Sequence, residues 1–242
     1  MAGIQLRVLK TGNCGENCVA GLDEAGRGSL VGELFVALTV FPQSVVKGSE
    51  LAGVRDSKAL EPLERRALIE RILEKACYAA VALIPPSMID EENLNRLEYR
   101  AMAYLLKDAA SRGVRPARIT IDLVGTLPRI KTSLARAGVR GNIVAEERAD
   151  AKYPEVSAAS IVAKVLRDER IRELAQQYGD MGSGYPSDPR ALEWLRQQCL
   201  SGEPPPIVRR SWRTLDRICP GKRVRKRRGQ KTLADFMGQE GL

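Results

Sequence analysis

Histidine is absent from the 242-residue chain. Its absence excludes the Ser-His-Asp triad, the Cys-His dyad, histidine-ligated zinc hydrolase sites and imidazole general bases. An enzyme with this sequence must therefore work with carboxylates, lysine, hydroxyl groups or a bound cofactor.

Long apolar segments are absent as well. The chain has no run of about 18 apolar residues, so the sequence predicts no membrane-spanning helix. The first ten residues, MAGIQLRVLK, contain no apolar core of a signal peptide. We therefore expect a cytoplasmic protein. A hydrophobic content of 44% is enough to bury one sizeable core.

Cysteine is infrequent and irregularly spaced. The five cysteines are Cys14, Cys18, Cys77, Cys199 and Cys219. Their odd number and scattered spacing argue against a disulfide framework. Cys14 and Cys18 could chelate zinc, but such a site needs about four ligands and no histidine is present to complete it. This pair is assigned no role.

Positive charge, in contrast, is abundant, with a formal net charge of +9. The segment 222–231, KRVRKRRGQK, contains seven basic residues and no acid. A basic segment of this kind fits a polyanionic partner such as nucleic acid. A solubilising tail is the alternative, because charge alone does not distinguish the two.

Hydrophobic patterning predicts strands and helices in alternation. Helices are expected over 62–75, 87–111, 127–137, 155–177 and 190–200, and a capping box of Ser87 and Asp90 is expected to open the second. Loops are expected at 56–60 and 182–189. Strands are expected over 18–24, 33–41, 77–85, 117–125 and 142–147. Three early strands followed by alternation indicate an α/β layer fold with a partly mixed sheet.

Four acids lie near predicted strand ends, where α/β sheets gather their ligand sites. They are Asp23, Glu24, Asp122 and Asp150. A bend at Asp23, permitted by Gly26 and Gly28, would allow the adjacent Glu24 to point the same way. Oxygen ligands without histidine suit Mg²⁺ or Mn²⁺, and two such ions serve phosphodiester hydrolysis. The alternative is that the acids are solvated strand ends.

The segment GRGSLVG, 26–32, has a faint likeness to a dinucleotide-binding loop. Its glycine spacing differs from the usual pattern, and a strand-like apolar run follows where a helix is required. An oxidoreductase is therefore disfavoured.

Five segments, taken in order, resemble those of ribonuclease HII, the type 2 ribonuclease H. They are GLDEAGRGSLVG (21–32), DSKAL (56–60), TIDLVG (120–125), ADAKYPEVSAASIVAKVLRDERI (149–171) and GSGYPSDP (182–189). The resemblance covers about residues 18–215, and VRRSWRT (208–214) looks like the archaeal and eukaryotic branch. It implies a ribonuclease H-like fold, with a central mixed sheet flanked by helices and a C-terminal helical portion.

The resemblance also implies an activity and its metal ligands. It implies cleavage of RNA in RNA/DNA hybrids and at single ribonucleotides embedded in duplex DNA. Mg²⁺ or Mn²⁺ is the implied cofactor, with two ions in the active state and 3′-hydroxyl and 5′-phosphate ends as products. The implied catalytic and metal-binding residues are Asp23, Glu24, Asp122 and Asp150. Asp168, despite its position, is not the fourth ligand in the family's pattern.

Substrate-binding residues follow from the same motifs. The turn Gly26, Arg27 and Gly28 would contact the ribose 2′-hydroxyl, which distinguishes RNA from DNA. Tyr185 would meet the sugar at the RNA–DNA junction. The remaining implied phosphate-binding residues are Lys58, Lys164 and Arg167. Ser157, Ser160, Lys164 and Arg167 share one predicted helix face, and a solvated amphipathic helix is the alternative for that face.

The C-terminal segment QKTLADFM, 230–237, resembles a PCNA-interacting peptide, the motif that docks on the sliding clamp. The implied clamp-binding residues are Gln230, Leu233, Phe236 and Met237, with Met237 in place of the usual second aromatic. The alternative is an unstructured tail with chance hydrophobic residues. A clamp motif on the catalytic chain itself points to the archaeal, single-subunit type.

These observations favour a metal-dependent endoribonuclease tethered to the replication clamp. We divide the chain into an N-terminal extension (1–17), a ribonuclease H-like catalytic core (18–180), a C-terminal helical portion (181–219) and a flexible basic tail (220–242). A catalytically inert or subunit-dependent nucleic-acid-binding clamp adaptor is the alternative. A junction resolvase of the same superfold is a third hypothesis, disfavoured by the Gly-Arg-Gly turn.

Overall fold

The structure is a computed structural model that describes residues 3–15, 17–48, 50–51 and 62–225. Lys58 lies outside the described residues, and so do the four predicted clamp-binding residues of the tail. Within the described ranges, no helix has the length and hydropathy required to cross a membrane.

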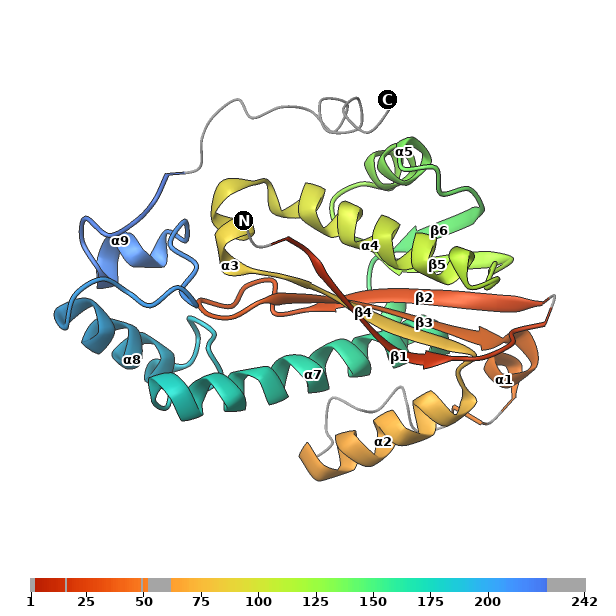
Figure 1. Cartoon of the computed structure of the whole chain (residues 1–242), viewed down its shortest axis with the longest axis horizontal. Helices are drawn as coiled ribbons and strands as arrows, with labels where there is room; N and C mark the ends of the chain where they lie inside the picture. Colours follow the sequence, from red (N-terminus) through yellow and green to blue (C-terminus); the bar gives the residue numbers. More distant parts are fainter. Residues whose placement is uncertain (1–2, 16, 49, 52–61, 226–242) are drawn as a thin grey trace.

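A six-stranded mixed sheet forms the centre of the molecule (Figure 1), with strand order β1-β4-β3-β2-β5-β6. The first four strands in this order pair antiparallel, whereas β2-β5 and β5-β6 pair parallel. The strands are β1 (Gln5–Thr11), β2 (Cys18–Ala25), β3 (Leu34–Pro42), β4 (Tyr78–Ile84), β5 (Arg118–Asp122) and β6 (Asn142–Glu146). The predicted mixed α/β sheet is confirmed.

Helices cover both faces of this sheet. In Figure 1, α4 and α5 lie on one face, α7 and α2 lie on the other, and α8 and α9 lie at one end. The helices are α1 (Gln43–Lys47), α2 (Pro62–Lys75), α3 (Pro86–Glu91), α4 (Leu94–Ser111), α5 (Leu127–Arg136), α6 (Ala149–Lys152), α7 (Pro154–Tyr178), α8 (Pro189–Leu200) and α9 (Thr214–Ile218).

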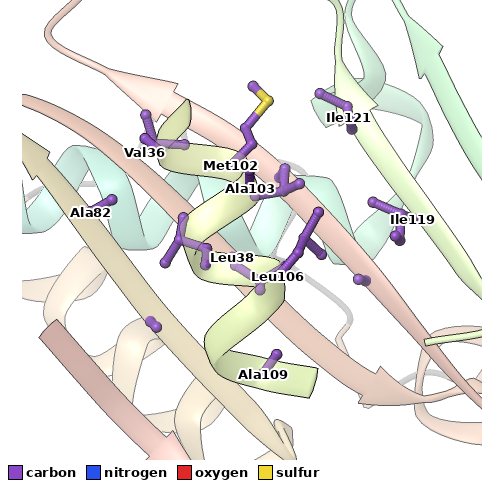
Figure 2. Packing of buried hydrophobic residues seen from close by; sticks show 14 of the residues in the cluster. Val36, Leu38, Ala82, Met102, Ala103, Leu106, Ala109, Ile119 and Ile121 are labelled. Carbon is purple, nitrogen blue, oxygen red and sulfur yellow. The ribbon is translucent and has the colours of Figure 1, made fainter. Parts of the chain in front are cut away.

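The core under α4 follows from side-chain alternation along the strands. Val36 and Leu38 of β3 and Ile121 of β5 point to the same face, where Met102 and Leu106 of α4 pack against them (Figure 2). This packing fixes α4 over β3 and β5, the two strands that flank the acid-bearing strand β2.

The opposite face is built by an unusually close approach of α7 to β2. A Cβ on Gly21 would lie 2.1 Å from the backbone oxygen of Glu155, so only glycine fits here. Ala158 and Val162 of α7 then pack with Ala37 of β3 in a second apolar cluster. The approach brings the N-terminal half of α7 directly against the acid-bearing strand.

A third apolar cluster joins the C-terminal residues to the segment after β2. Leu30 and Val31 pack there with Leu174 of α7, Trp194 of α8 and Leu215 of α9. The end of the described chain is therefore anchored on the segment that follows the Gly-Arg-Gly turn.

The helix predicted over 87–111 is two helices, α3 and α4. Asn93 interrupts it, because its side chain accepts a hydrogen bond from the Arg96 backbone N–H and caps α4. The predicted capping box is wrong. The carboxylate of Asp90 instead accepts the backbone N–H groups of Arg210 and Ser211, at 2.8 and 2.7 Å.

Two disulfides contradict the expectation drawn from the cysteine spacing. They join Cys14 to Cys77 and Cys199 to Cys219, whereas Cys18 is buried and free. The first pair forms because strand β1, which the patterning missed, runs antiparallel to β4. That pairing brings together cysteines 63 residues apart, which spacing alone does not reveal.

Candidate active site at the ends of β2 and β5

Two predicted acids lie side by side because β2 and β5 run parallel. The last residues that pair between these two strands are Leu22 and Ile121. Asp23 and Asp122 follow them directly, so both carboxylates lie at the same edge of the sheet. Burial of Asp23 is nearly complete, with 5% of the residue exposed.

The predicted bend at Asp23 is wrong, because β2 stays paired with β3 as far as Ala25. Alternation is therefore kept: Asp23 bonds to Ser160 of α7, whereas Glu24 faces Glu98 and Arg27. The carboxyl groups of the two acids still interact with each other and with Asp122. The Glu24 backbone N–H donates to Asp23 Oδ1 at 2.7 Å.

Asp150 lies on the short helix α6. This helix is tied to β5, because the backbone N–H of Ala149 donates to Asp122 Oδ1 at 2.8 Å. Arg148, just before it, holds a left-handed backbone with φ of 56°. Among the described residues, no three carboxylate or cysteine side chains are arranged to hold one ion together. Joint metal binding by the four acids therefore stays a prediction.

Electrostatics nevertheless favour a cation at this edge. Burial, followed by repulsion from Glu24, raises the pKa of Asp23 well above its usual value. Burial and the Glu98 carboxylate likewise raise the pKa of Glu24. The Glu24 Oε2 atom is buried and has no hydrogen-bond partner in the described part of the chain. A divalent ion would fit this oxygen-rich donor set, because it would neutralise the repulsion and pair the orphaned oxygen.

The Gly-Arg-Gly turn is held on one side by residues of α4 and on the other by Arg209. The Arg27 guanidinium donates to Glu98 and Asn95 of α4. Arg209 is fully buried and donates to the carbonyl oxygens of Gly26 and Arg27 at 2.7 and 3.1 Å. The turn is thus fixed from both sides, with its Gly26 at a φ of +88°.

Tyr185 lies against the same turn. A Cβ on Gly28 would lie 3.9 Å from its ring, so a side chain at this position would contact the tyrosine. The Arg167 guanidinium stacks 4.2 Å from the ring centroid. Arg167 is buried and donates to the Ser29 hydroxyl and the Ser183 carbonyl. Its guanidinium contacts the tyrosine and its loop, and the phosphate contact assigned to Arg167 stays a prediction.

The predicted polar face of α7 is not solvated. Ser157 and Ser160 are each 3% exposed, which makes the solvated-helix alternative wrong. Lys164 donates to the Ser160 hydroxyl at 2.7 Å, and Ser160 in turn bonds to Asp23. Lys164 is therefore linked to the acids through one hydroxyl.

Sequence reasoning missed Glu98 and Arg209. Burial raises the pKa of Glu98 to about 7, although the Arg27 guanidinium opposes the shift. A signal for Glu98 was available: it shares the apolar stripe of α4 with Ala101, Met102 and Leu105 at helical spacing. An acid on a buried stripe requires a partner. Arg209 lies in the segment VRRSWRT (208–214), but nothing in that segment indicates that its guanidinium is buried against the turn.

Comparisons with known proteins agree with this architecture. The ribonuclease HII family model matches residues 20–215. Ribonuclease HII of Hyperthermus butylicus is 41% identical over 226 residues, covering 90% of this chain and 93% of that protein. The crystal structure of ribonuclease H2 from Pyrococcus horikoshii is 39% identical, covers 83% of this chain and 96% of that one, and gives a TM-score of 0.76.

A second solved structure is the PCNA:RNase HII complex from Archaeoglobus fulgidus. It is 35% identical, covers 90% of this chain and 100% of that chain, and gives a TM-score of 0.71. Fold and site together define a nuclease with the ribonuclease H-like fold. The chain belongs to the ribonuclease HII family and is an endonuclease of the ribonuclease H type. The predicted fold class, family and enzyme class are confirmed.

Proposed function

We propose that this enzyme hydrolyses RNA in RNA/DNA hybrids and at single ribonucleotides embedded in duplex DNA. The observation that carries the proposal is the buried, mutually repelling pair Asp23 and Glu24 beside Asp122, directly before a turn that carries Arg27. Metal-dependent phosphodiester chemistry and recognition of a ribose would then occur within one site. The proposed products carry 3′-hydroxyl and 5′-phosphate ends.

Asp23, Glu24, Asp122 and Asp150 are the residues that would hold Mg²⁺ or Mn²⁺, two ions in the active state. Such ions lower the pKa of bound water and neutralise charge on the attacked and leaving oxygens. The chain's own residues orient two of these carboxylates. Ser160 bonds to Asp23, and the backbone N–H of Ala149 fixes Asp122.

Recognition of the ribonucleotide is assigned to the turn 26–28 and Tyr185. Glycines allow backbone groups to approach a 2′-hydroxyl, which both donates and accepts a hydrogen bond. Arg27 is 37% exposed at its side chain, so it can reach a ligand while Glu98 holds it. Tyr185 offers a ring for a sugar or base, with Arg167 fixing its orientation.

A PCNA-type sliding clamp is the proposed protein partner, through Gln230, Leu233, Phe236 and Met237. The support is the tail motif together with the Archaeoglobus fulgidus relative, which was solved as a complex with PCNA. The division into extension, core, helical portion and tail belongs to the same proposal, as does a cytoplasmic location.

The test uses a DNA duplex carrying one ribonucleotide, with Mg²⁺, Mn²⁺ or EDTA. The wild type should nick it on the 5′ side of the ribonucleotide with Mg²⁺ or with Mn²⁺, and should not nick it in EDTA. Asp122→Asn should bind the duplex and not nick it, because one metal ligand is lost. Asp216→Asn is the matched control, since Asp216 is an exposed acid of α9 that pairs with Arg223. Binding without nicking by the wild type, with both ions, would favour the adaptor.

A further inference from the structure

A groove lies between the N-terminal half of α4 and helix α5, outside the residues assigned above to catalysis. Its volume is about 580 Å³. None of the residues that line it is acidic, and they include Asn95, Arg96, Tyr99, Arg129, Thr132 and Arg136.

The three arginines of this groove are available to a ligand. Arg96, Arg129 and Arg136 are exposed, and none forms an ion pair with a carboxylate in the described ranges. Neighbouring Arg100, in contrast, pairs with Glu92. Three exposed guanidinium groups without an acidic partner among the described residues favour the binding of an anion.

Four of the five polar side chains of α5 form one stripe. Arg129, Thr132, Ser133 and Arg136 follow at i, i+3, i+4 and i+7, so they share the face that borders the groove. Seven residues of α-helix span about 10 Å, which is the axial rise of about three nucleotides of one duplex strand. The stripe therefore suits successive phosphates of a strand better than a single small anion.

The groove begins where the ribonucleotide is proposed to bind. Asn95, which lines the groove, accepts a hydrogen bond from Arg27 of the turn. Tyr99, which also lines it, donates to the carbonyl of Val124 at 2.8 Å, two residues after Asp122. A strand bound at the turn could thus continue along α5.

We propose that the groove binds the phosphate backbone of the nucleic-acid substrate, beyond the ribonucleotide and without regard to base or sugar. The inference rests on the proposed function for its substrate class. It assigns Arg96, Arg129 and Arg136 to sequence-independent affinity, and it leaves recognition of the ribose to the turn.

The test is the salt dependence of binding by Arg129→Gln/Arg136→Gln in the full chain. Each phosphate contact contributes about 0.9 to the slope of log K against log salt on duplex DNA. The double variant should reduce the slope by about two between about 50 and 200 mM salt. Affinity should fall by the same factor for all-DNA and ribonucleotide-containing duplexes. In nicking assays KM should rise while kcat stays the same.

The matched control is Arg7→Gln/Arg115→Gln, which removes the same charge from two exposed arginines elsewhere. Arg7 is on the edge strand β1. Arg115 lies three residues before the start of β5, whereas Asp122 lies at the end of that strand. This variant should keep the wild-type slope. Equal loss in both double variants would overturn the proposal, because net charge alone would explain it.

The remaining outcomes separate this inference from the proposed function. An unchanged slope in the groove variant, with ribonucleotide nicking intact in the wild type, would overturn the inference alone. A reduced slope with no nicking by the wild type would support the groove and remove the proposed reaction. Inorganic phosphate is added as a competitor: weakening of duplex binding only in chains with an intact groove supports the assignment. If phosphate binds there without affecting duplex binding, the groove is a small-anion site and the proposal fails.

Discussion

Two sets of arginines in this molecule carry the same charge and do different work. Arg167 and Arg209 are buried, and the partners of their guanidinium groups are protein oxygens and rings. Arg129 and Arg136 are exposed and have no carboxylate partner among the described residues. The first set fixes the shape of the turn and the tyrosine loop. The second offers its charge to a ligand, so a net charge of +9 does not by itself locate a binding surface.

The largest effect is expected when a buried arginine is replaced. If such an arginine proved dispensable for stability, the distinction between the two sets would fail. Arg209→Ala would remove the guanidinium donor from the carbonyls of Gly26, Arg27 and Gly32, of which Gly26 keeps the backbone N–H of Ser29 at 3.2 Å. Unpaired buried polar groups are costly, so we expect a loss of about 3–5 kcal/mol in the free energy of unfolding, measured with urea. Arg209→Lys should recover only part of it, because an ammonium cannot reproduce the fork. A loss below about 0.5 kcal/mol, the level of surface substitutions, would contradict this role.

A second change weakens the hold on Arg27, an arginine that is partly exposed and is paired with the buried Glu98. Glu98→Gln keeps an acceptor for Arg27 and removes the charge. A charge-assisted hydrogen bond exceeds a neutral one by about 1 kcal/mol or more, so kcat/KM on the ribonucleotide duplex should fall roughly tenfold. The salt slope on all-DNA duplex should stay the same. Glu91→Gln, an exposed neighbour on α3, is the control and should behave as the wild type.

The stacked pair Arg167 and Tyr185 tests whether a buried arginine acts through a partner. A double-mutant cycle of Arg167→Met and Tyr185→Leu on kcat/KM should show coupling of about 0.5–2 kcal/mol, as expected for a desolvated cation–π contact. Additive effects would mean that the tyrosine is oriented without Arg167.

The smallest effect is expected for an exposed arginine. Arg136→Gln should change the free energy of unfolding by less than about 0.5 kcal/mol, because no described carboxylate pairs with it and glutamine is a good helix former. A larger loss of the free energy of unfolding in urea would mean that Arg136 stabilises the fold, as Arg167 and Arg209 do, and would contradict the distinction between the two sets.

The sequence predicted elements well where periodicity was strong. The apolar runs that form β2, β3 and β4 were located to within about two residues, as was the long helix α7. The exposed edge strand β1 was missed because its partly polar sequence gives only a weak strand pattern. The break before α4 was missed because one asparagine cap outweighed the helical pattern around it.

The site was predictable only as far as its motifs extend. Asp23, Glu24 and Asp122 were found because acids at strand ends are visible in a linear pattern. Glu98 and Arg209 act on the turn from 71 and more than 180 residues away, and such contacts depend on tertiary packing. The burial of Arg167 also depends on tertiary packing. Helical spacing predicted which face of α7 carries it, but not that this face is buried.

The hydrogen bonds that hold the Gly-Arg-Gly turn also have a consequence for the order in which the chain folds during synthesis. The acids of β2 leave the ribosome early, whereas the groups that hold the turn come late: Arg209 bonds to Gly26, and the Trp212 indole donates to the Ser29 carbonyl at 2.6 Å. Chain elongation must therefore pass Trp212 before both groups can hold the turn.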